Sequence, residues 1–467
     1  MGTRGSGLGT GGTGRTGGTG RSWTSDEVAA ALGVPSPGKL TFTSISTDTR
    51  APSPQSLFIA LKGEKFDAHN FLAQAKAEGA TAAVVRRGTP AVPGLPLFEV
   101  EDTLTALGLL ARARRRMLPA GTPVVAITGS SGKTSTKEMI RAALGARYRV
   151  HATDGNLNNL VGVPLTILRA PDDTEALVVE AGASIPGEIA KLRDIIEPTI
   201  AVITNIGYAH VEGFGSLEGV MAEKLSILDG APVAILGSGP DTMWPEARRR
   251  TQVIPAALPG KSNDDALLDR YLDRDGHPRL ALDSGEMVTL PALGMHQLEN
   301  AQIALAVAQR AGVEHDAAVR ALAHVQLPDG RGDMRTAGGL LVIDDSYNAN
   351  PSSMRRAVQT AAWLAQRQHR PLVIVVGTML ELGPESARLH AEAAREIVRR
   401  KPALVAAVGT FARVFETLRE DLGGRLITAA DANALGPKLK SALRGNELVL
   451  LKASRGVALE RVLSYIG

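Results

Sequence analysis

The sequence predicts an α/β protein with mainly parallel sheets, and three observations support this fold class. The chain has 467 residues, which is too long for a single hydrophobic core and predicts several domains. Short, nearly all-apolar segments alternate with helical patterns, as in parallel sheets that are buried on both faces. This alternation occurs twice, after Val124 and again after Leu340, so we expect two such sheets besides a small N-terminal α/β unit.

The composition favours a cytoplasmic enzyme. Hydrophobic residues make up 44% of the chain and cysteine is absent, so we expect neither disulfide bonds nor thiol chemistry. No apolar run reaches the roughly 18–20 residues of a membrane helix, and the N-terminus lacks the apolar core of a secretory signal. The formal net charge is +4, but the arginines are not interleaved with aromatic residues. We therefore expect anionic, phosphorylated substrates and no nucleic-acid partner.

The N-terminal region divides into a tail and a small α/β unit. Residues 1–21 consist mainly of Gly, Thr and Arg, and we expect this tail to be disordered. The unit that follows extends to about residue 102. Its expected elements are strands at 56–61 and 82–87 and a helix at 70–79. An amphipathic helix from Asp102 to Arg116 then leads into the next strand.

A glycine loop follows the first strand of the central region. The sequence AITGSSGKTST at 126–136 places this loop between an apolar strand and a helix at 133–145, which is the context of a phosphate-binding loop. The loop is two residues shorter than the common G-x-x-x-x-G-K-[ST] pattern. Lys133 would bridge the β- and γ-phosphates of a nucleotide, and Thr134 would ligate Mg²⁺. The predicted nucleotide contacts here are Gly129, Ser130, Ser131, Gly132, Lys133, Thr134 and Ser135.

Polar residues at the ends of the next strands predict a metal site beside this loop. The expected elements are strands at 176–182 and 199–207 and a helix near 187–194. Glu180 and His210 end or follow these strands, and the carboxyl ends of parallel strands meet at one edge of a sheet. We expect both residues to be metal ligands, with Lys224 on the following helix. Asn158 and Asn159 lie in a loop that is either part of the site or an Asx turn.

The second alternation predicts a C-terminal α/β domain after a hinge at Pro328–Gly330. Its expected elements are strands at 340–345, 371–377, 403–409 and 447–454 and helices from Ser353 and at 385–399. The segment DDSYNANPSSM at 344–354 ends the first of these strands with two acids, which often bind ribose. We expect Ser352 or Ser353 to cap the helix that follows.

These segments, in this order, resemble the Mur ligase family. The segments that carry the resemblance are ITGSSGKTSTKEMI, GNLNNLVGVPLTIL, AGASIPGEI, TNIGYAHVEGFGS, MHQLENAQIALA, DDSYNANPSSM and LELGPESARLH. The resemblance spans about residues 43–465, and GNLNN with GVPLT and DSYNANP are its most specific parts. It implies a UDP-precursor-binding domain at 22–102, a central P-loop ATP-binding domain at 103–328 and a C-terminal Rossmann-like ligase domain at 329–467.

The resemblance also implies the activity. NANP favours the family member that joins D-alanyl-D-alanine to UDP-N-acetylmuramoyl-tripeptide through an acyl phosphate, in peptidoglycan precursor synthesis. ATP and two Mg²⁺ ions would be required, and a monomer is expected. Three alternatives stay open: a sister ligase that adds the third amino acid, a ligase like folylpolyglutamate synthase, and a regulatory P-loop nucleotide-binding protein.

The resemblance assigns roles to individual residues. Lys133, Glu180, His210 and a carbamylated Lys224 would be catalytic, and the metal ligands would be Thr134, Glu180, His210 and Lys224 as carbamate. The implied nucleotide contacts beyond the loop are Asn300, Arg331 and Asp345, with Arg335 as a rival to Arg331. The implied substrate contacts are Thr49, Arg50, Asn158, Asn159, Asn348, Asn350, Lys452, Ser454 and Arg455. The chain departs from the family pattern at Ala181, Leu225, Ser226 and Thr378.

Overall fold

The computed structural model describes residues 21–50, 54–63, 65–256 and 265–466. The predicted disordered tail lies outside the described residues apart from Arg21. The chain forms two compact units, one up to Ala113 together with Ile167–Asp173 and the other from the remaining residues. The predicted domain boundaries after residues 102 and 328 stay predictions.

The first unit contains a four-stranded parallel sheet in the order β3-β4-β5-β6. Its described elements are β1 (Trp23–Thr24), α1 (Ser25–Leu32), β2 (Thr41–Phe42), β3 (Ser44–Ser46), β4 (Ser56–Ile59), η1 (Ala68–Phe71), α2 (Leu72–Ala77), β5 (Ala80–Arg86), β6 (Leu97–Val100) and α3 (Thr103–Arg116). The predicted strands are present. The helix predicted at 70–79 is shorter and is preceded by a 3₁₀ turn, because the Asp67 side chain accepts a hydrogen bond from the His69 N–H and starts that turn.

The central sheet of the second unit runs in the order β12-β11-β10-β7-β9-β8, with parallel pairing throughout its described strands. The strands are β7 (Val124–Thr128), β8 (Val150–Ala152), β9 (Ala176–Glu180), β10 (Ile200–Asn205), β11 (Val233–Ser238) and β12 (Gln252–Pro255). Every residue of β7, β9 and β10 is buried, as expected for a sheet covered on both faces. The predicted α/β class with mainly parallel sheets is therefore confirmed.

The glycine loop follows β7, the strand from which the chain continues first to one side of the sheet and later to the other. From β7 the chain moves to β8 and β9 on one side of the sheet, and then returns to β10, β11 and β12 on the other. In open parallel sheets, ligands bind in the crevice at the carboxyl ends of the strands, at the point where the strand order reverses in this way. The loop after β7 and the ends of β9 and β10 meet at this point.

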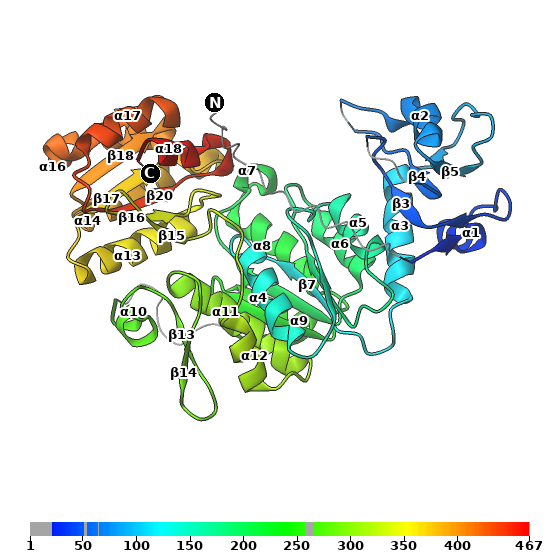
Figure 1. Ribbon diagram of the computed structural model, residues 1–467, viewed down its shortest axis with the longest axis horizontal. Helices are drawn as coiled ribbons and strands as arrows, with labels where there is room; N and C mark the ends of the chain where they lie inside the picture. The colour runs from blue at the N-terminus through cyan, green and yellow to red at the C-terminus, as the bar shows by residue number, and fades with distance from the viewer. Residues whose placement is uncertain (1–20, 51–53, 64, 257–264, 467) are drawn as a thin grey trace, which may run out of the picture. The chain divides into compact units, whose positions relative to one another are not determined.

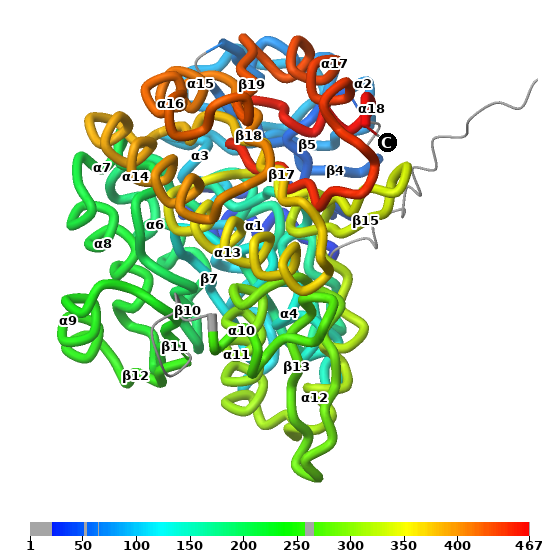
Figure 2. Tube along the Cα trace, turned by 90° about the vertical axis from the view of Figure 1, so that its left-hand side faces the viewer, coloured from blue at the N-terminus to red at the C-terminus, as the bar shows by residue number. Residues whose placement is uncertain are grey.

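Helices cover the central sheet, and α4, α11 and α12 pack together on it (Figure 1 and Figure 2). The described helices of this part are α4 (Lys133–Gly145), α5 (Gly162–Leu168), α6 (Glu188–Ile196), α7 (Val211–Phe214), α8 (Leu217–Leu225), η2 (Ser226–Leu228), α9 (Met243–Arg250), α10 (Asp265–Tyr271), α11 (Met295–Arg310) and α12 (His315–Leu322). A hairpin of β13 (Arg279–Ala281) and β14 (Met287–Thr289) precedes α11. No helix in the described ranges has the length and apolar character needed to cross a membrane.

The C-terminal sheet runs in the order β15-β16-β20-β17-β18-β19, and its described pairs are parallel except for β15 with β16. The strands are β15 (Asp333–Ala337), β16 (Leu340–Asp344), β17 (Leu372–Val376), β18 (Leu404–Val408), β19 (Leu426–Ala429) and β20 (Leu448–Lys452). Alternate side chains of β17 face opposite cores: Ile374 packs in the core that includes Leu364 of α13, and Val373 in the core that includes Leu439 of α17.

Helices flank the C-terminal sheet on both faces, with α13 and α14 on one side and α17 and α18 on the other (Figure 1). The described helices are α13 (Pro351–Arg367), η3 (Gly383–Glu385), α14 (Ser386–Arg399), α15 (Gly409–Glu416), α16 (Arg419–Leu422), η4 (Gly423–Arg425), α17 (Ala432–Ala442), η5 (Arg455–Val457), η6 (Leu459–Val462) and α18 (Leu463–Ile466). The predicted cap of α13 at Ser352 or Ser353 is wrong. Asn350 is the N-cap, because its side chain accepts a hydrogen bond from the Ser353 N–H while the Ser353 hydroxyl accepts one from the Asn350 N–H.

Candidate active site

A cavity of about 270 Å³ lies at the carboxyl ends of β7, β9 and β10. Residues of the central sheet and of the C-terminal sheet both line it. The predicted site residues that line the cavity are Ser130, Ser131, Gly132, Lys133, Thr134, Ser135, Asn158, Glu180, His210, Asn300, Arg331, Asp345, Asn348, Asn350 and Lys452. The structure thus brings most of the predicted site together.

The glycine loop can be built only with glycine at its two ends. Gly129 and Gly132 have positive φ angles of 151° and 78°. A Cβ atom at Gly129 would lie 1.9 Å from Thr204 Oγ1, and one at Gly132 would lie 2.8 Å from Asn300 Oδ1. Both the backbone conformation and the close approach therefore require glycine.

Strand β10 holds the loop in place. The Thr204 hydroxyl donates a hydrogen bond to the Ser131 carbonyl at 2.6 Å, and the Ser131 N–H donates to Asn205 Oδ1 at 3.1 Å. The Ser130 hydroxyl donates to the Gly207 carbonyl at 2.8 Å. These contacts fix the loop backbone ahead of α4, whose N-terminal N–H groups form an anion site together with the loop.

Lys133 begins α4, and its ammonium group donates a hydrogen bond to the Gly129 carbonyl at 2.8 Å. Burial lowers the pKa of Lys133, the Glu180 carboxylate raises it, and Arg331 lowers it. The ammonium therefore has a carboxylate, Glu180, and a second cation, Arg331, as its charged neighbours. Together, Lys133 and Arg331 are suited to bind an anion that enters the cavity.

Glu180 ends β9 and is 2% exposed. Its carboxylate accepts hydrogen bonds from the Thr134 hydroxyl at 3.0 Å and from the Asn158 amide at 2.8 Å. Asn159 turns elsewhere, because its side-chain oxygen accepts from the Val161 and Gly162 N–H groups at the start of α5. Of these two asparagines, only Asn158 lines the cavity.

His210 caps the N-terminus of α7 with a positive φ of 55°. Its Nδ1 atom lies 2.5 Å from Oε2 of Glu381, which precedes η3 in the C-terminal part of the chain. Burial and the nearby Lys133 lower the pKa of His210, and Glu381 offsets only part of this by raising it. The imidazole is therefore favoured in its neutral form, which is the form that ligates metals.

Lys224 is 1% exposed on α8 and does not line the cavity. Burial and the nearby Lys133 lower its pKa to about 7. Its neighbour Glu223 accepts hydrogen bonds from the Gly187 and Ile189 N–H groups at 2.7 Å each. A neutral amine is therefore well populated at Lys224 near pH 7.

The C-terminal sheet contributes an ion pair to the cavity. Lys452 Nζ lies 2.6 Å from Asp345 Oδ2 and donates a hydrogen bond to the Asn348 carbonyl at 2.8 Å. Burial raises the pKa of Asp345, and Lys452 lowers it. The Arg331 guanidinium lies over the Tyr347 ring, 4.1 Å from its centroid.

Several predicted residues lie outside the cavity lining. Arg335, the rival of Arg331, pairs with Asp344 at 3.1 Å. Ser454 donates a hydrogen bond to the Ala349 carbonyl at 3.1 Å, and Arg455 pairs with Glu460 at 3.1 Å. In the first compact unit, the exposed Arg50 pairs with Asp48 at 2.6 Å, and the Thr49 carbonyl accepts a hydrogen bond from Gln74 at 3.2 Å.

The cavity lining also contains residues that the sequence analysis did not assign to the site, among them His296, Gln297 and Arg356. Gln297 accepts a hydrogen bond from the Asn300 amide at 2.9 Å, and Arg356 forms an ion pair with Glu299. His296 Nδ1 is buried without a hydrogen-bond partner in the described part of the chain. Their signal was present, since MHQLEN contains His296 and Gln297 next to Asn300, and Arg356 follows NANPSSM by two residues.

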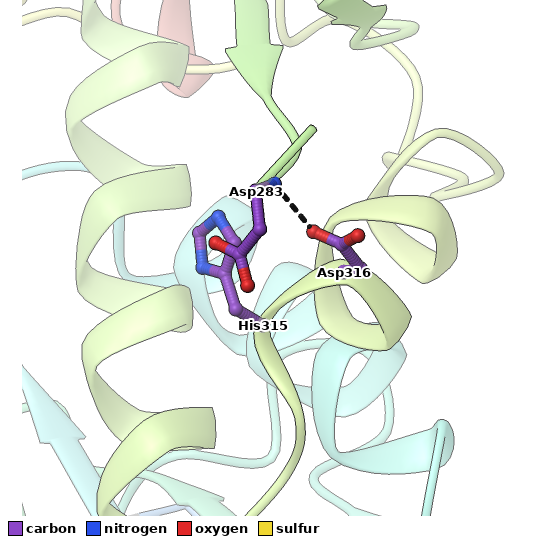
Figure 3. Close-up of side chains that lie close together, drawn as sticks. All are labelled: Asp283, His315 and Asp316. Atoms are coloured by element: carbon purple, nitrogen blue, oxygen red, sulfur yellow. Dashed lines mark hydrogen bonds between the residues drawn. The ribbon is translucent and has the colours of Figure 1, made fainter. Parts of the chain in front are cut away.

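Within the described residues, Asp283, His315 and Asp316 form a group whose possible ligand atoms lie within 4.8 Å of one another (Figure 3). These side chains are largely exposed, and Asp316 already accepts a hydrogen bond from the Asp283 N–H at 2.8 Å. The group also lies at the N-terminus of α12, where the helix dipole disfavours a cation. We do not assign it a metal.

Known proteins share this architecture. The chain matches the models of the Mur ligase family catalytic domain at 41–115, the Mur ligase middle domain at 127–308, and the Mur ligase glutamate ligase domain at 330–455. The UDP-N-acetylmuramoyl-tripeptide–D-alanyl-D-alanine ligase of Bacillus subtilis is 36% identical over 428 residues, which cover 90% of this chain and 92% of that protein.

Solved structures agree with this relationship. A crystal structure of MurF from Acinetobacter baumannii has a TM-score of 0.83 and 31% identity, with 96% of this chain and 99% of that chain covered. MurF ligase from Thermotoga maritima, solved in complex with ADP, has a TM-score of 0.77 and 29% identity, with 91% and 96% covered. From the family models, the B. subtilis relative and these structures, we conclude that the chain belongs to the Mur ligase family.

Proposed function

We propose that the protein joins D-alanyl-D-alanine to UDP-N-acetylmuramoyl-tripeptide at the expense of ATP, in cytoplasmic peptidoglycan precursor synthesis. The γ-phosphoryl group of ATP passes to the C-terminal carboxylate of the tripeptide, giving an acyl phosphate and ADP. The amine of D-alanyl-D-alanine attacks the acyl carbon. The tetrahedral intermediate loses phosphate, and the amine loses a proton, which leaves an amide bond.

One observation carries this proposal: the phosphate loop and the Asp345–Lys452 pair line the same cavity. A phosphoryl donor held by the loop and an acyl acceptor held from the C-terminal sheet would meet there. A regulatory nucleotide-binding protein has no need of this second set of residues. The printed names of the related ligases support the same activity.

The charges of the cavity suit a reaction between two anions. A carboxylate and a triphosphate repel each other, and cations between them lower that cost. Lys133, Arg331 and Lys452 supply positive charge in the cavity lining. Asp345, a hydrogen-bond acceptor beside Lys452, is our candidate for the ribose contact. Because Asn300 abuts Gly132, we propose that Asn300 contacts the nucleotide next to the loop.

The donor set also fits Mg²⁺, which prefers oxygen ligands. Thr134 and Glu180 present a hydroxyl and a carboxylate 3.0 Å apart in the cavity lining, and His210 lines the same cavity. We propose that these residues hold magnesium at two sites, where the ion would neutralise phosphate charge. Lys224 would join them as a carbamate, because its lowered pKa supplies the neutral amine that reacts with CO₂.

The remaining assignments are also proposals. Thr49 and Arg50 would contact the uridine end of the precursor. Asn158, Asn159, Asn348, Asn350, Lys452, Ser454 and Arg455 would contact or support the peptide substrates. We expect a monomer of three domains with the boundaries given above.

A phosphate-release assay tests the function against its alternatives. We expect release only when UDP-N-acetylmuramoyl-tripeptide, D-alanyl-D-alanine and ATP are all present. A sister ligase would accept a dipeptide precursor and a single amino acid instead, and a folylpolyglutamate synthase would accept a folate and glutamate. Release from ATP without any acceptor would favour the regulatory class and contradict our proposal.

A further inference from the structure

A short segment after β17 contacts the part of the chain that carries His210. Glu381 Oε2 lies 2.5 Å from His210 Nδ1, and the Glu381 carbonyl accepts a hydrogen bond from the Glu212 N–H at 3.3 Å. Gly383 packs closely as well, since a Cβ atom there would lie 3.3 Å from Glu212 Cα. Two segments that are distant in the sequence therefore meet at the imidazole.

This contact fixes the position of the imidazole proton. A carboxylate only accepts hydrogen bonds, so a neutral His210 must carry its proton on Nδ1 to donate to Glu381. The other ring nitrogen, Nε2, then keeps a free lone pair, which is the electronic state of a metal ligand. Metal-binding histidines commonly donate their second ring N–H to a carboxylate in this way.

The segment that presents Glu381 is itself held by two backbone hydrogen bonds. Glu381 has a positive φ of 62°, a conformation that costs a non-glycine residue on the order of 1 kcal/mol. The Met379 N–H donates to Nε2 of the fully buried His390 at 3.0 Å, and the Leu380 N–H donates to Ser454 Oγ at 2.9 Å. The strained conformation is therefore maintained by its neighbours. This is typical of a residue with a positioning role.

We propose that Glu381 is a positioning residue for the ligase reaction: it orients His210 and holds the imidazole as the Nδ1–H tautomer, ready to ligate magnesium through Nε2. The role of His210 in this inference rests on the proposed function. Because Glu381 belongs to the C-terminal part of the chain, His210 acquires this orientation only when that part is seated on the central sheet. Ser454 accepts a hydrogen bond from the Leu380 N–H and donates one to the Ala349 carbonyl. It therefore connects the Glu381 segment, which contacts the proposed metal ligand His210, with the loop of the C-terminal part that we propose to bind substrate.

The test compares two glycine substitutions in the full-length chain. Glu381→Gly removes the carboxylate at a left-handed backbone position that glycine adopts without strain. Lys401→Gly is the matched control, because Lys401 is exposed and also has a positive φ, 49°, but does not contact His210. Glu381→Gln keeps an acceptor oxygen on the same stem and should rescue most of the loss. Thermal unfolding midpoints of all three variants should lie near that of the wild type.

Three readouts separate positioning from a merely structural role. In ¹⁵N NMR, the His210 imidazole should be the Nδ1–H tautomer in the wild type and a mixture in Glu381→Gly. Binding of Mn²⁺ alone, followed by electron paramagnetic resonance, should weaken about 10- to 100-fold, and kcat should fall by a similar factor. KM for ATP should change less than about two-fold, because the phosphate loop is untouched.

The outcomes distinguish this inference from the proposed function. If the wild type fails to join the two substrates, the proposed function is wrong, but the tautomer and Mn²⁺ measurements still decide the role of Glu381. If Glu381→Gly behaves like Lys401→Gly in tautomer and Mn²⁺ affinity, the inference is wrong even if activity falls. A Gln variant as impaired as the glycine variant would also contradict the hydrogen-bonding role.

Discussion

At the scale of single residues, Lys133 is the most direct test of the phosphate loop. Its ammonium is held by the Gly129 carbonyl and remains available for an anion. Lys133→Ala should lower kcat/KM by about 10³-fold or more, because a charge contact to the transferring phosphoryl group is lost. Arg141→Ala, an exposed change on the same helix, is the control. Turnover above roughly a tenth of the wild-type value in Lys133→Ala would contradict this assignment.

Lys224 allows a chemical test. A free ammonium beside magnesium would repel the ion, whereas a carbamate offers it two oxygens. Lys224→Ala should be nearly inactive and should regain activity when short-chain carboxylates are added, while the exposed Lys191→Ala should stay active without them. Steady-state assays at low bicarbonate measure the activity of both variants with and without added carboxylate. Full activity of Lys224→Ala under those conditions would exclude the carbamate.

His296 predicts a dependence of stability on pH. Burial, together with the nearby Arg356 and Lys452, lowers its pKa from 6.5 to about 3. Between these values the unfolded chain binds a proton that the folded chain does not, so folding stability should fall as pH decreases from about 6.5 toward 3. The partly exposed ring reduces the effect to on the order of 1–2 kcal/mol between pH 7 and pH 5.

Urea unfolding at both pH values can measure this effect. His296→Gln should show a smaller loss of stability at pH 5 than the wild type does. His324→Gln, a change at an exposed histidine, should behave like the wild type. Equal losses in the wild type and His296→Gln would show that other groups cause the acid sensitivity.

At the scale of elements, the N-cap residues of α13 and α17 can be compared directly. Asn350 and Asp431 each accept a hydrogen bond from a backbone N–H of their helix, but only Asn350 also donates one to the Ser130 carbonyl, at 3.2 Å. Either change to Ala should reduce stability by about 1 kcal/mol. Only Asn350→Ala should also raise KM for ATP, since the phosphate loop loses a support. If KM for ATP also rises in Asp431→Ala, the rise in Asn350→Ala results from lost stability and not from a lost contact with the phosphate loop.

Strands were easier to predict than helix starts, for a physical reason. The segments that became β7, β9 and β10 are short apolar runs bounded by polar residues or glycine, so composition alone marks them. The start of α13 depends on which of several neighbouring polar side chains turns back to the backbone. Pro351 lacks an N–H and fits the first turn of the helix, which makes Asn350 the N-cap.

At the scale of the whole molecule, nucleotide should favour a compact arrangement. The cavity is lined from both the central and the C-terminal sheet, so a ligand that contacts both binds best when they are together. Small-angle scattering should show a smaller radius of gyration with an ATP analogue and the precursor than without them. Lys133→Ala should show little change under the same conditions. An unchanged radius in the saturated wild type would contradict closure.

The sequence predicted the members of the site better than their contacts. The ends of β7 and β9 are adjacent in any parallel sheet of this order, so the proximity of Lys133 and Glu180 followed from topology. The pairing of His210 with Glu381 did not, because it depends on how two distant segments pack. Tertiary structure likewise determines that Arg331 lines the cavity while Arg335 pairs with Asp344 on the neighbouring strand.

The order of the C-terminal sheet has a consequence for the biosynthesis of the protein. β20 follows every other described strand in the sequence, yet it lies between β16 and β17. Until it arrives, two apolar strands have unpaired edges that face each other across a gap, and such edges are templates for aggregation. A nascent chain therefore depends on protection of these edges until β20 has been translated. A chain that terminated before β20 would leave both edges unpaired and should be prone to aggregation.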